Sequence, residues 1–186
     1  LGVGSGTHGE QTAQEIEGIE KILLEVRPDY LVLYGDTNST LAGAIAASKL
    51  RVPIVHIEAG LRSFNKSMPE EINRIMCDHA STLLFSPTAT GFNNLVSEGF
   101  KTNNLAPYTC DNPGIFHCGD IMYDNSLYFA GLAEMKSGIL AQWGLNQGRF
   151  ILGTIHRDNN TDIPGRLNAI FSAFDRISRE HRLLVA

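Results

Sequence analysis

Short apolar runs alternate with helical patterns along this chain, and that alternation restricts the folds it can adopt. The runs at 30–34 and 53–57 are typical of buried parallel strands. The Ala-rich segment 39–49 between them has a helical composition, with Asn38 or Ser39 as its expected N-cap. Two parallel strands joined by a helix form a βαβ unit, whose crossover is almost always right-handed. The sequence therefore predicts an α/β fold with a parallel sheet.

The same alternation continues to the end of the chain. Apolar residues at spacings of three and four mark the helices, whereas the polar segment 100–114 is expected to be a surface loop. The expected helices span residues 10–26, 39–49, 69–79, 86–98, 123–142 and 163–179. The expected strands span residues 30–34, 53–57, 82–85, 114–118, 149–154 and 182–186.

Carboxylates stand at the ends of the expected strands and at the start of a helix. They are Asp36, Glu58, Glu70 and Glu71. In an open α/β sheet, such positions converge on the crevice outside the carboxyl ends of the strands. Glu58 follows an apolar strand and precedes two small residues, a setting in which acids often have raised pKa values and act as general acids or bases. Asp36 fits the same site, and it also fits a plain turn or N-cap role.

Glu70 and Arg74 are four residues apart, so they share one face of the helix expected at 69–79. That spacing alone equally fits a surface ion pair. Pro69, however, suits the first turn of this helix, which would open at the crevice, and a helix N-terminus attracts anions such as phosphate. We therefore favour a site role for Glu70 and Arg74, and expect Glu71 to support the helix.

Histidines add a second set of candidates. His156 and Arg157 follow the strand at 149–154, where a guanidinium could grip an anion such as phosphate in bidentate fashion. His8 lies in a Gly-rich loop and could approach a ligand. His56 lies inside a strand, so a core histidine is the expectation there.

Composition excludes several classes of function. A net charge of −5 without any basic run argues against a nucleic-acid surface. No apolar stretch approaches the roughly 20 residues of a membrane span. The three cysteines have no metal-like spacing and fit free thiols in a reducing compartment, which predicts a cytoplasmic protein without a metal site. The chain begins at Leu1 and ends in an interrupted strand, so we expect a fragment of a longer protein.

Six segments together resemble the UDP-N-acetylglucosamine 2-epimerase family. They occur in the family's order and extend over nearly the whole chain. The segments are His8-Gly-Glu-Gln-Thr12, Gly35-Asp-Thr-Asn-Ser-Thr40, His56-Ile-Glu-Ala-Gly-Leu-Arg-Ser63, Pro69-Glu-Glu-Ile-Asn-Arg74, Phe85-Ser-Pro-Thr88 and Thr154-Ile-His-Arg157. Any one of them is a weak signal, but the ordered set is highly specific.

The resemblance implies two Rossmann-like domains with parallel sheets in a GT-B-like architecture, incomplete at both ends. Residues 1–122 would form the later part of the N-terminal domain, which holds the catalytic carboxylates. Residues 123–146 would form a connecting helix. Residues 147–186 would begin the C-terminal, nucleotide-binding domain, and a complete member would have roughly twice as many residues.

The resemblance also implies the chemistry of the non-hydrolysing members. UDP-N-acetylglucosamine and UDP-N-acetylmannosamine would interconvert at C2 by elimination and re-addition of UDP, with no cofactor, to supply cell-surface polysaccharide precursors. The implied catalytic residues are Asp36, Glu58, Glu70, Arg74 and His156. The implied substrate-binding residues are His8, Gln11, Arg62 and Arg157. The implied partners are the UDP-sugar and a second copy of the full-length chain, in a homodimer.

Alternative functions stay open at this point. The sequence of residues 62–69 also resembles the same segment in members that act on UDP-2,3-diacetamido-glucuronic acid. A hydrolysing epimerase would use the same carboxylates. Asn159 stands where the family commonly has Glu, which also allows a module that binds a UDP-sugar without turning it over. A glycosyltransferase of the same architecture is disfavoured, because it does not need this carboxylate set.

Overall fold

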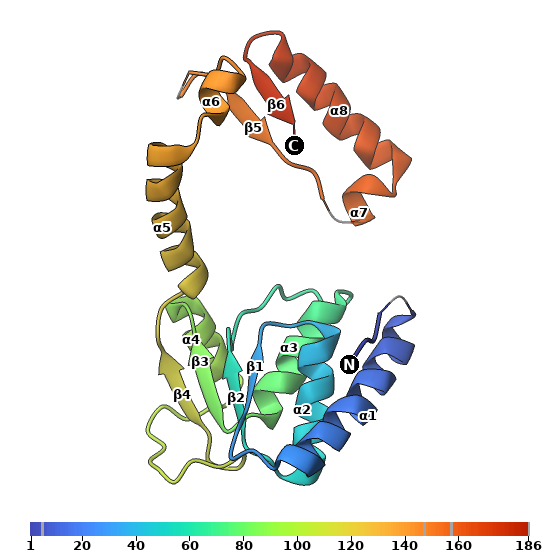
Figure 1. Cartoon of the computed structure of the whole chain (residues 1–186), viewed down its shortest axis with the longest axis vertical. Coiled ribbons are helices and arrows are strands. Elements are labelled where there is room, and N and C mark those ends of the chain that lie inside the picture. The colour runs from blue at the N-terminus through green and yellow to red at the C-terminus, as the bar shows by residue number, and fades with distance from the viewer. Residues whose placement is uncertain (5, 147, 157, 186) are drawn as a thin grey trace. The chain divides into compact units, whose positions relative to one another are not determined.

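The computed structural model describes residues 1–4, 6–146, 148–156 and 158–185 (Figure 1). Contacts within the chain divide it into two compact units, Leu1–Asn125 and Ser126–Ala186. The first unit has a parallel sheet with the strand order β1-β2-β3-β4, and the second has a parallel pair, β5-β6. The expected α/β class with parallel sheets is therefore confirmed.

In the first unit, helices alternate with strands. The strands are β1 (Leu31–Tyr34), β2 (Ile54–Ile57), β3 (Leu83–Ser86) and β4 (Gly114–His117). The helices are α1 (His8–Val26), α2 (Asn38–Leu50), α3 (Pro69–Ala80) and α4 (Ala89–Ser97). The register pairs Tyr34 with Ile57 and Ser86 with His117, so the carboxyl ends of the strands lie along one edge of the sheet (Figure 1).

Small side chains allow α2 to lie close to the sheet. A Cβ atom at Gly43 would stand 2.7 Å from Cδ2 of Leu33 in β1. The core around this contact also contains Leu23 of α1, Ile54 of β2 and Cys77 of α3. Each large apolar side chain buried in such a core stabilises the fold by about 1.5–3 kcal/mol. This packing fixes α1, α2 and α3 against β1 and β2.

A second core joins α4 to the other half of the sheet. Its buried members are Ala59, Leu84, Leu95 and Ile115, and Phe92 and Phe100 pack against it. Because Ala59 follows β2 directly, this core supports the backbone that leaves the carboxyl end of that strand.

The second unit is smaller. Helix α5 (Ile121–Lys136) begins in the first unit and continues into the second. The remaining elements are α6 (Ile139–Gln142), β5 (Ile151–Gly153), α7 (Asp158–Thr161), α8 (Pro164–Ser178) and β6 (Leu183–Val185). The Arg182 guanidinium donates to the carbonyls of Trp143 and Gly144 at 2.7 and 2.8 Å, which ties the start of β6 to the end of α6.

Three details of the sequence prediction are wrong. His8 is the first residue of α1 and does not lie in a loop. The single helix expected at 123–142 is two helices, α5 and α6, separated by Ser137 and Gly138. These residue types favour helix ends over helix interiors. The N-cap of α2 is Thr37, whose hydroxyl accepts from the Thr40 amide at 3.3 Å, and neither Asn38 nor Ser39 takes that position.

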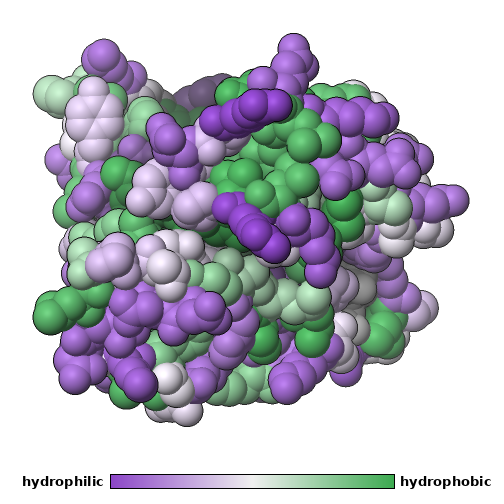
Figure 2. Space-filling model, turned by 90° about the horizontal axis from the view of Figure 1, so that it is seen from below, coloured by the Kyte–Doolittle hydropathy of each residue, from purple (hydrophilic) through white to green (hydrophobic). Residues whose placement is uncertain are grey.

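One face of the molecule is visible in Figure 2, seen from below relative to Figure 1. Hydrophilic and hydrophobic side chains are interspersed there. Apolar side chains scattered among polar ones are ordinary on a protein surface, so we assign no function to their presence on this face.

Among the glycines of the first unit, Gly60 would bring an added Cβ closest to another atom, and it yields a stability test. Its φ is 79°, and an added Cβ would stand 2.2 Å from the Gly91 carbonyl oxygen. Gly60→Ala is therefore expected to lower the free energy of unfolding by about 2 kcal/mol or more, measured by denaturant unfolding of the full-length protein. Gly131→Ala is the control, because its Cβ would meet no atom within 4 Å and alanine favours the α5 helix. Equal stability of the two variants would contradict the close approach.

Candidate active site

Two carboxylates meet at the carboxyl edge of the sheet. Asp36 follows β1 across the turn at Gly35, and Glu58 follows β2 directly. An added Cβ at Gly35 would lie 3.6 Å from Oε2 of Glu58, so the two strand ends are close. Glu58 has a φ of 71°, a left-handed conformation that costs energy for a residue other than glycine. Strain of this kind is concentrated at functional sites.

Arg74 joins these two carboxylates. Its Nη2 donates to Oδ2 of Asp36 at 2.5 Å, and its Nη1 donates to the Glu58 carbonyl at 2.5 Å. Nη1 also lies 3.6 Å from Oε2 of Glu58. The Arg74 side chain is 10% exposed, while both carboxylates are 31% exposed. The Arg74 guanidinium is thus more buried than the two carboxylates, which reach the solvent.

Helix α3 brings Arg74 to this edge. Pro69 occupies its first turn as expected, and Asn73 donates to the Asp36 carbonyl at 2.9 Å. Arg74 therefore pairs with Asp36 and Glu58 across the sheet edge, and the simple surface ion pair with Glu70 is not formed. Glu70 is exposed, and its carboxylate has no hydrogen bond or ion pair among the described residues, which leaves it available to a ligand.

His8 and Gln11 reach the same neighbourhood through Asn38. The Asn38 amide lies 2.9 Å from Nδ1 of His8 and donates to Oε1 of Gln11 at 3.3 Å. Asn73 donates to Oδ1 of Asn38 at 3.3 Å, which links α1 to α3. The structure thus brings two of the predicted substrate-binding residues near Asp36, and it adds Asn38 and Asn73, which sequence reasoning did not propose as site residues.

Arg62 is held by carboxylates of the first unit. Its side chain is 1% exposed, and Nη2 lies 2.7 Å from Oδ2 of Asp78. Nε and Nη2 also donate to the two oxygens of Glu98, each at 2.7 Å. This guanidinium is therefore occupied within the structure, and its predicted role in substrate binding stays a prediction.

Glu71 has a larger structural role than expected. Its carboxylate is buried and accepts from the Ser63 amide at 2.7 Å, the Ser63 hydroxyl at 2.9 Å and the Phe64 amide at 3.1 Å. Burial favours the neutral acid, but these hydrogen bonds and the charge of Arg62 outweigh it and lower the pKa of Glu71. Glu71 therefore anchors the loop between β2 and α3 as well as belonging to the helix.

The second unit holds the remaining candidates. His156 follows β5, is exposed, and accepts from the Asn160 amide through its carbonyl at 3.2 Å. Arg157 lies outside the described residues.

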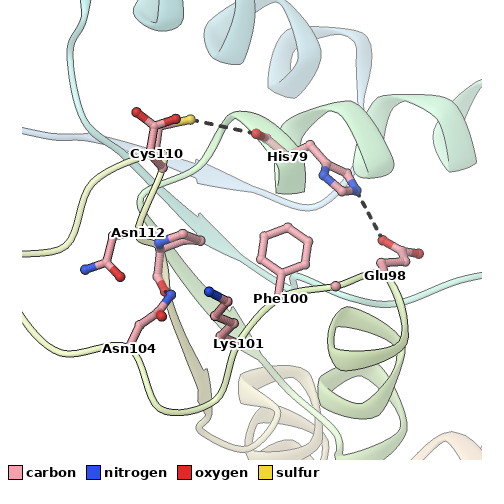
Figure 3. Close-up of a pocket in the computed structure, with 10 residues that line it drawn as sticks. His79, Glu98, Phe100, Lys101, Asn104, Cys110 and Asn112 are labelled. Atoms are coloured by element: carbon pink, nitrogen blue, oxygen red, sulfur yellow. Dashed lines mark hydrogen bonds and ion pairs between the residues drawn. The ribbon is translucent and has the colours of Figure 1, made fainter.

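Cavities occur at both edges of the sheet in the first unit. One of about 200 Å³ lies at the carboxyl edge and is lined by Glu58, Pro87 and Asp120 among others. Another, of about 240 Å³, lies at the amino edge, where His79, Glu98 and Lys101 line it (Figure 3). The first contains a predicted catalytic residue and the second contains none, so the carboxyl edge is the better candidate for an active site.

The arrangement at the carboxyl edge suits proton transfer beside an anion. Asp36 and Glu58 can exchange protons with a ligand, and Arg74 offers a cation next to them. Within the described residues, no group of three or more His, Cys, Asp or Glu side chains is placed to hold a metal ion. In the same part of the chain, no helix is long and apolar enough to cross a membrane.

Comparison with known proteins gives the family. The sequence profile of the UDP-N-acetylglucosamine 2-epimerases matches residues 1–186. The chain belongs to the UDP-N-acetylglucosamine 2-epimerase family. The resemblance of the six segments is therefore confirmed.

Similar proteins of the family come from archaea and bacteria. A UDP-N-acetylglucosamine 2-epimerase homolog of Methanococcus maripaludis is 49% identical over 94% of this chain and 46% of its own length. A UDP-2,3-diacetamido-2,3-dideoxy-D-glucuronate 2-epimerase of Pseudomonas aeruginosa is 48% identical over 95% of this chain and 46% of its own. The chain thus spans about half the length of the curated relatives it matches.

Solved structures of epimerases share the fold. The Methanocaldococcus jannaschii UDP-GlcNAc 2-epimerase, crystallised with UDP-GlcNAc and UDP, aligns with a TM-score of 0.81 and 40% identity over 100% of this chain and 49% of its own. A Rickettsia bellii epimerase aligns with a TM-score of 0.78 and 29% identity over 98% of this chain and 45% of its own. The GT-B-like architecture expected from the sequence is confirmed by these neighbours.

Glu71 yields a pH-dependent stability test. Its lowered pKa contributes stability that is present above the ordinary value of 4.5 and is lost as the pH falls through the folded-state value. Glu71→Gln is expected to lower the free energy of unfolding by about 1–3 kcal/mol at pH 7, because buried donors lose a charged acceptor. The difference should shrink below pH 4. Glu70→Gln, on the exposed face of the same turn, is the matched control, and an equal loss in both variants would contradict the anchoring role.

Proposed function

We propose that this chain is part of an epimerase that inverts C2 of a UDP-N-acetylhexosamine, interconverting UDP-N-acetylglucosamine and UDP-N-acetylmannosamine. UDP leaves by elimination across C1 and C2 and then adds back, with the C2 proton returned on the other face. The observation that carries the proposal is the bridge from Arg74 to Asp36 and Glu58 at the carboxyl edge of the sheet, in a chain of this family.

Each proposed residue has a chemical role in that reaction. Asp36, Glu58 and Glu70 supply the carboxylates that remove and return the C2 proton. Arg74 and His156 steady the charge of the departing diphosphate. The proposed substrate-binding residues are His8, Gln11, Arg62 and Arg157. Partial exposure of Asp36 and Glu58 and full exposure of Glu70 support access by a sugar.

The proposal extends to the complete protein. Residues 1–122 belong to the N-terminal domain with the carboxylates, residues 123–146 connect the domains, and residues 147–186 begin the nucleotide-binding domain. The complete protein acts as a homodimer and supplies precursors of cell-surface polysaccharide. Free thiols at Cys77, Cys110 and Cys118 support a cytoplasmic location.

A second substrate has an observation of its own. The Pseudomonas aeruginosa relative, named for UDP-2,3-diacetamido-2,3-dideoxy-D-glucuronate, is 48% identical, close to the 49% of the Methanococcus maripaludis homolog. The sequence of residues 62–69, in the loop anchored by Glu71, resembles that of such enzymes. The same carboxylates would perform the same proton transfers on this sugar.

Turnover in deuterated water tests the reaction and the substrate together. The full-length protein is incubated with each UDP-sugar, and the C2 position and the products are followed by NMR. The expected result is deuterium at C2 and an equilibrium mixture of the two epimers of one UDP-sugar. Free sugar and UDP in equal amounts would replace the proposal with a hydrolysing epimerase. Absence of turnover with both sugars would leave only a binding module.

Glu58→Gln provides the sharpest activity test. The amide cannot take up or return a proton, so kcat for C2 exchange is expected to fall by about a hundredfold or more. The fold should persist, because the backbone carbonyl of Glu58 that binds Arg74 is retained. Exposed Glu134→Gln on α5 is the control and should turn over as the wild type does. A Glu58→Gln enzyme with wild-type kcat would remove Glu58 from the mechanism.

A further inference from the structure

His56 lies between two groups that accept hydrogen bonds. Its Nδ1 is 2.6 Å from Oδ1 of Asp78, and its Nε2 is 2.9 Å from the Gly35 carbonyl. The ring is fully buried, so water cannot replace either partner. A carbonyl can only accept, and a neutral imidazole has a single N–H. Both contacts can be N–H donations only if the ring carries a proton on each nitrogen.

Two neutral forms of the ring are the alternatives. In one, an unprotonated Nε2 would face the Gly35 carbonyl oxygen at 2.9 Å, where two lone pairs repel. In the other, the ring would lie beside a protonated Asp78, and the surroundings of Asp78 argue against that form. The other carboxylate oxygen, Oδ2, lies 2.7 Å from the Arg62 guanidinium and accepts from the Gly60 amide at 3.1 Å. A permanent cation and an amide donor both favour the ionised carboxylate. Asp78 is therefore charged, and the proton belongs to His56.

Charges in this buried cluster balance. His56 and Arg62 are the cations, and Asp78 and Glu98 are the anions that contact them. A buried charge is tolerated when it is paired and hydrogen-bonded, as each is here. At the outer end, Glu98 also lies 3.5 Å from Nε2 of His79, where the cluster opens on the cavity at the amino edge (Figure 3).

Each member of the cluster that touches His56 shares a structural element with a proposed active-site residue. His56 and Glu58 are both on or directly after β2, two residues apart. Asp78 and Arg74 are one turn apart on α3, and so lie on one face of that helix. Gly35 and Asp36 are neighbours in one turn. The set of Gly35, His56 and Asp78, with both side chains fully buried, thus lies next to the set of Asp36, Glu58 and Arg74.

We propose that His56 is a permanently charged imidazolium that positions the active site: by clamping the Gly35 carbonyl to α3 through Asp78, it fixes Asp36 relative to Glu58 and Arg74. This inference rests on the proposed epimerase function for its catalytic consequence, but the charge state of the ring does not. His56 touches no substrate in this scheme and acts through Asp36.

The electrostatics of the site agree with a charged ring. Burial favours the neutral form, but the hydrogen bond to Asp78, the neighbouring Cys77 side chain and the charge of Asp78 outweigh it and raise the pKa of His56 to about 10. Asp78 and Cys77 face the ring from α3, Arg62 acts from the loop through Asp78, and the Gly35 carbonyl faces it from the turn after β1.

The charge state is measured by NMR on full-length protein labelled with ¹⁵N at histidine. Both nitrogens of His56 are expected to carry protons from pH 6 to pH 9, with no titration over that range. The denatured protein is the control, because an unfolded histidine titrates near its ordinary pKa of about 6.5. A ring with one unprotonated nitrogen at pH 8 in the folded protein would overturn the inference, whether or not the protein is an epimerase.

Positioning is tested by His56→Gln and His56→Leu, with His79→Gln as the control. Glutamine can still donate to the Gly35 carbonyl, whereas leucine cannot. We expect kcat for C2 exchange to fall about tenfold in His56→Gln and about a hundredfold in His56→Leu, with KM within about threefold of wild type in both. Turnover is measured per folded molecule, so a loss of stability alone changes neither the kcat nor the KM of a variant relative to wild type.

Several outcomes count against positioning. Equal kcat values in folded His56→Gln and His56→Leu would overturn the positioning role. A wild-type kcat in His56→Gln would also overturn it. If the leucine variant does not fold, the kcat of His56→Gln alone decides. A wild-type enzyme without C2 exchange on either UDP-sugar would refute the proposed function and with it this catalytic role, while the NMR result on the charge of His56 would still stand.

Discussion

The bridge from Arg74 to Asp36 and Glu58 is the contact on which the candidate site depends. Two carboxylates at neighbouring strand ends repel each other, and a guanidinium that is largely buried between them offsets that repulsion. The bridge also has a mechanical consequence, because Arg74 binds the side chain after β1 and the backbone after β2 at once. Three elements of the fold, β1, β2 and α3, are thereby held in one geometry.

Beneath that bridge, the same three elements are tied a second time by His56, Asp78 and the Gly35 carbonyl. Burying so many charges is costly unless each has a partner, and here Arg62 and Glu98 complete the set. The upper layer is open to solvent and suits chemistry. The lower layer is buried at His56, Asp78 and Arg62 and reaches solvent at Glu98. Its cost is understandable if precise placement of Asp36 is what it provides.

Sequence reasoning found the order of strands and helices. It also placed Asp36 and Glu58 at one edge of the sheet, because strand-end position is a local signal in an α/β chain. It missed Asp78, Glu98 and the anchoring role of Glu71. Their partners are 18 to 36 residues away or lie across a loop, and no local spacing marks such pairs. It also merged α5 and α6 into one helix, because the helical pattern continues on both sides of Ser137 and Gly138, where the helix is interrupted. Side-chain pairs that form only in the tertiary structure could thus not be predicted from the sequence, whereas positions set by local periodicity could.

Glu70 and Glu71 show how little sequence distance separates a chemical role from a structural one. Successive residues of a helix point about 100° apart, so the first turn of α3 turns Glu70 to solvent and Glu71 into the loop that leaves β2. Glu71 uses its charge to hold Ser63 and Phe64, and its carboxylate is then unavailable to a ligand. Glu70 has no such contact among the described residues. Of two adjacent glutamates, Glu71 therefore supports the fold, whereas the Glu70 carboxylate stays open to solvent.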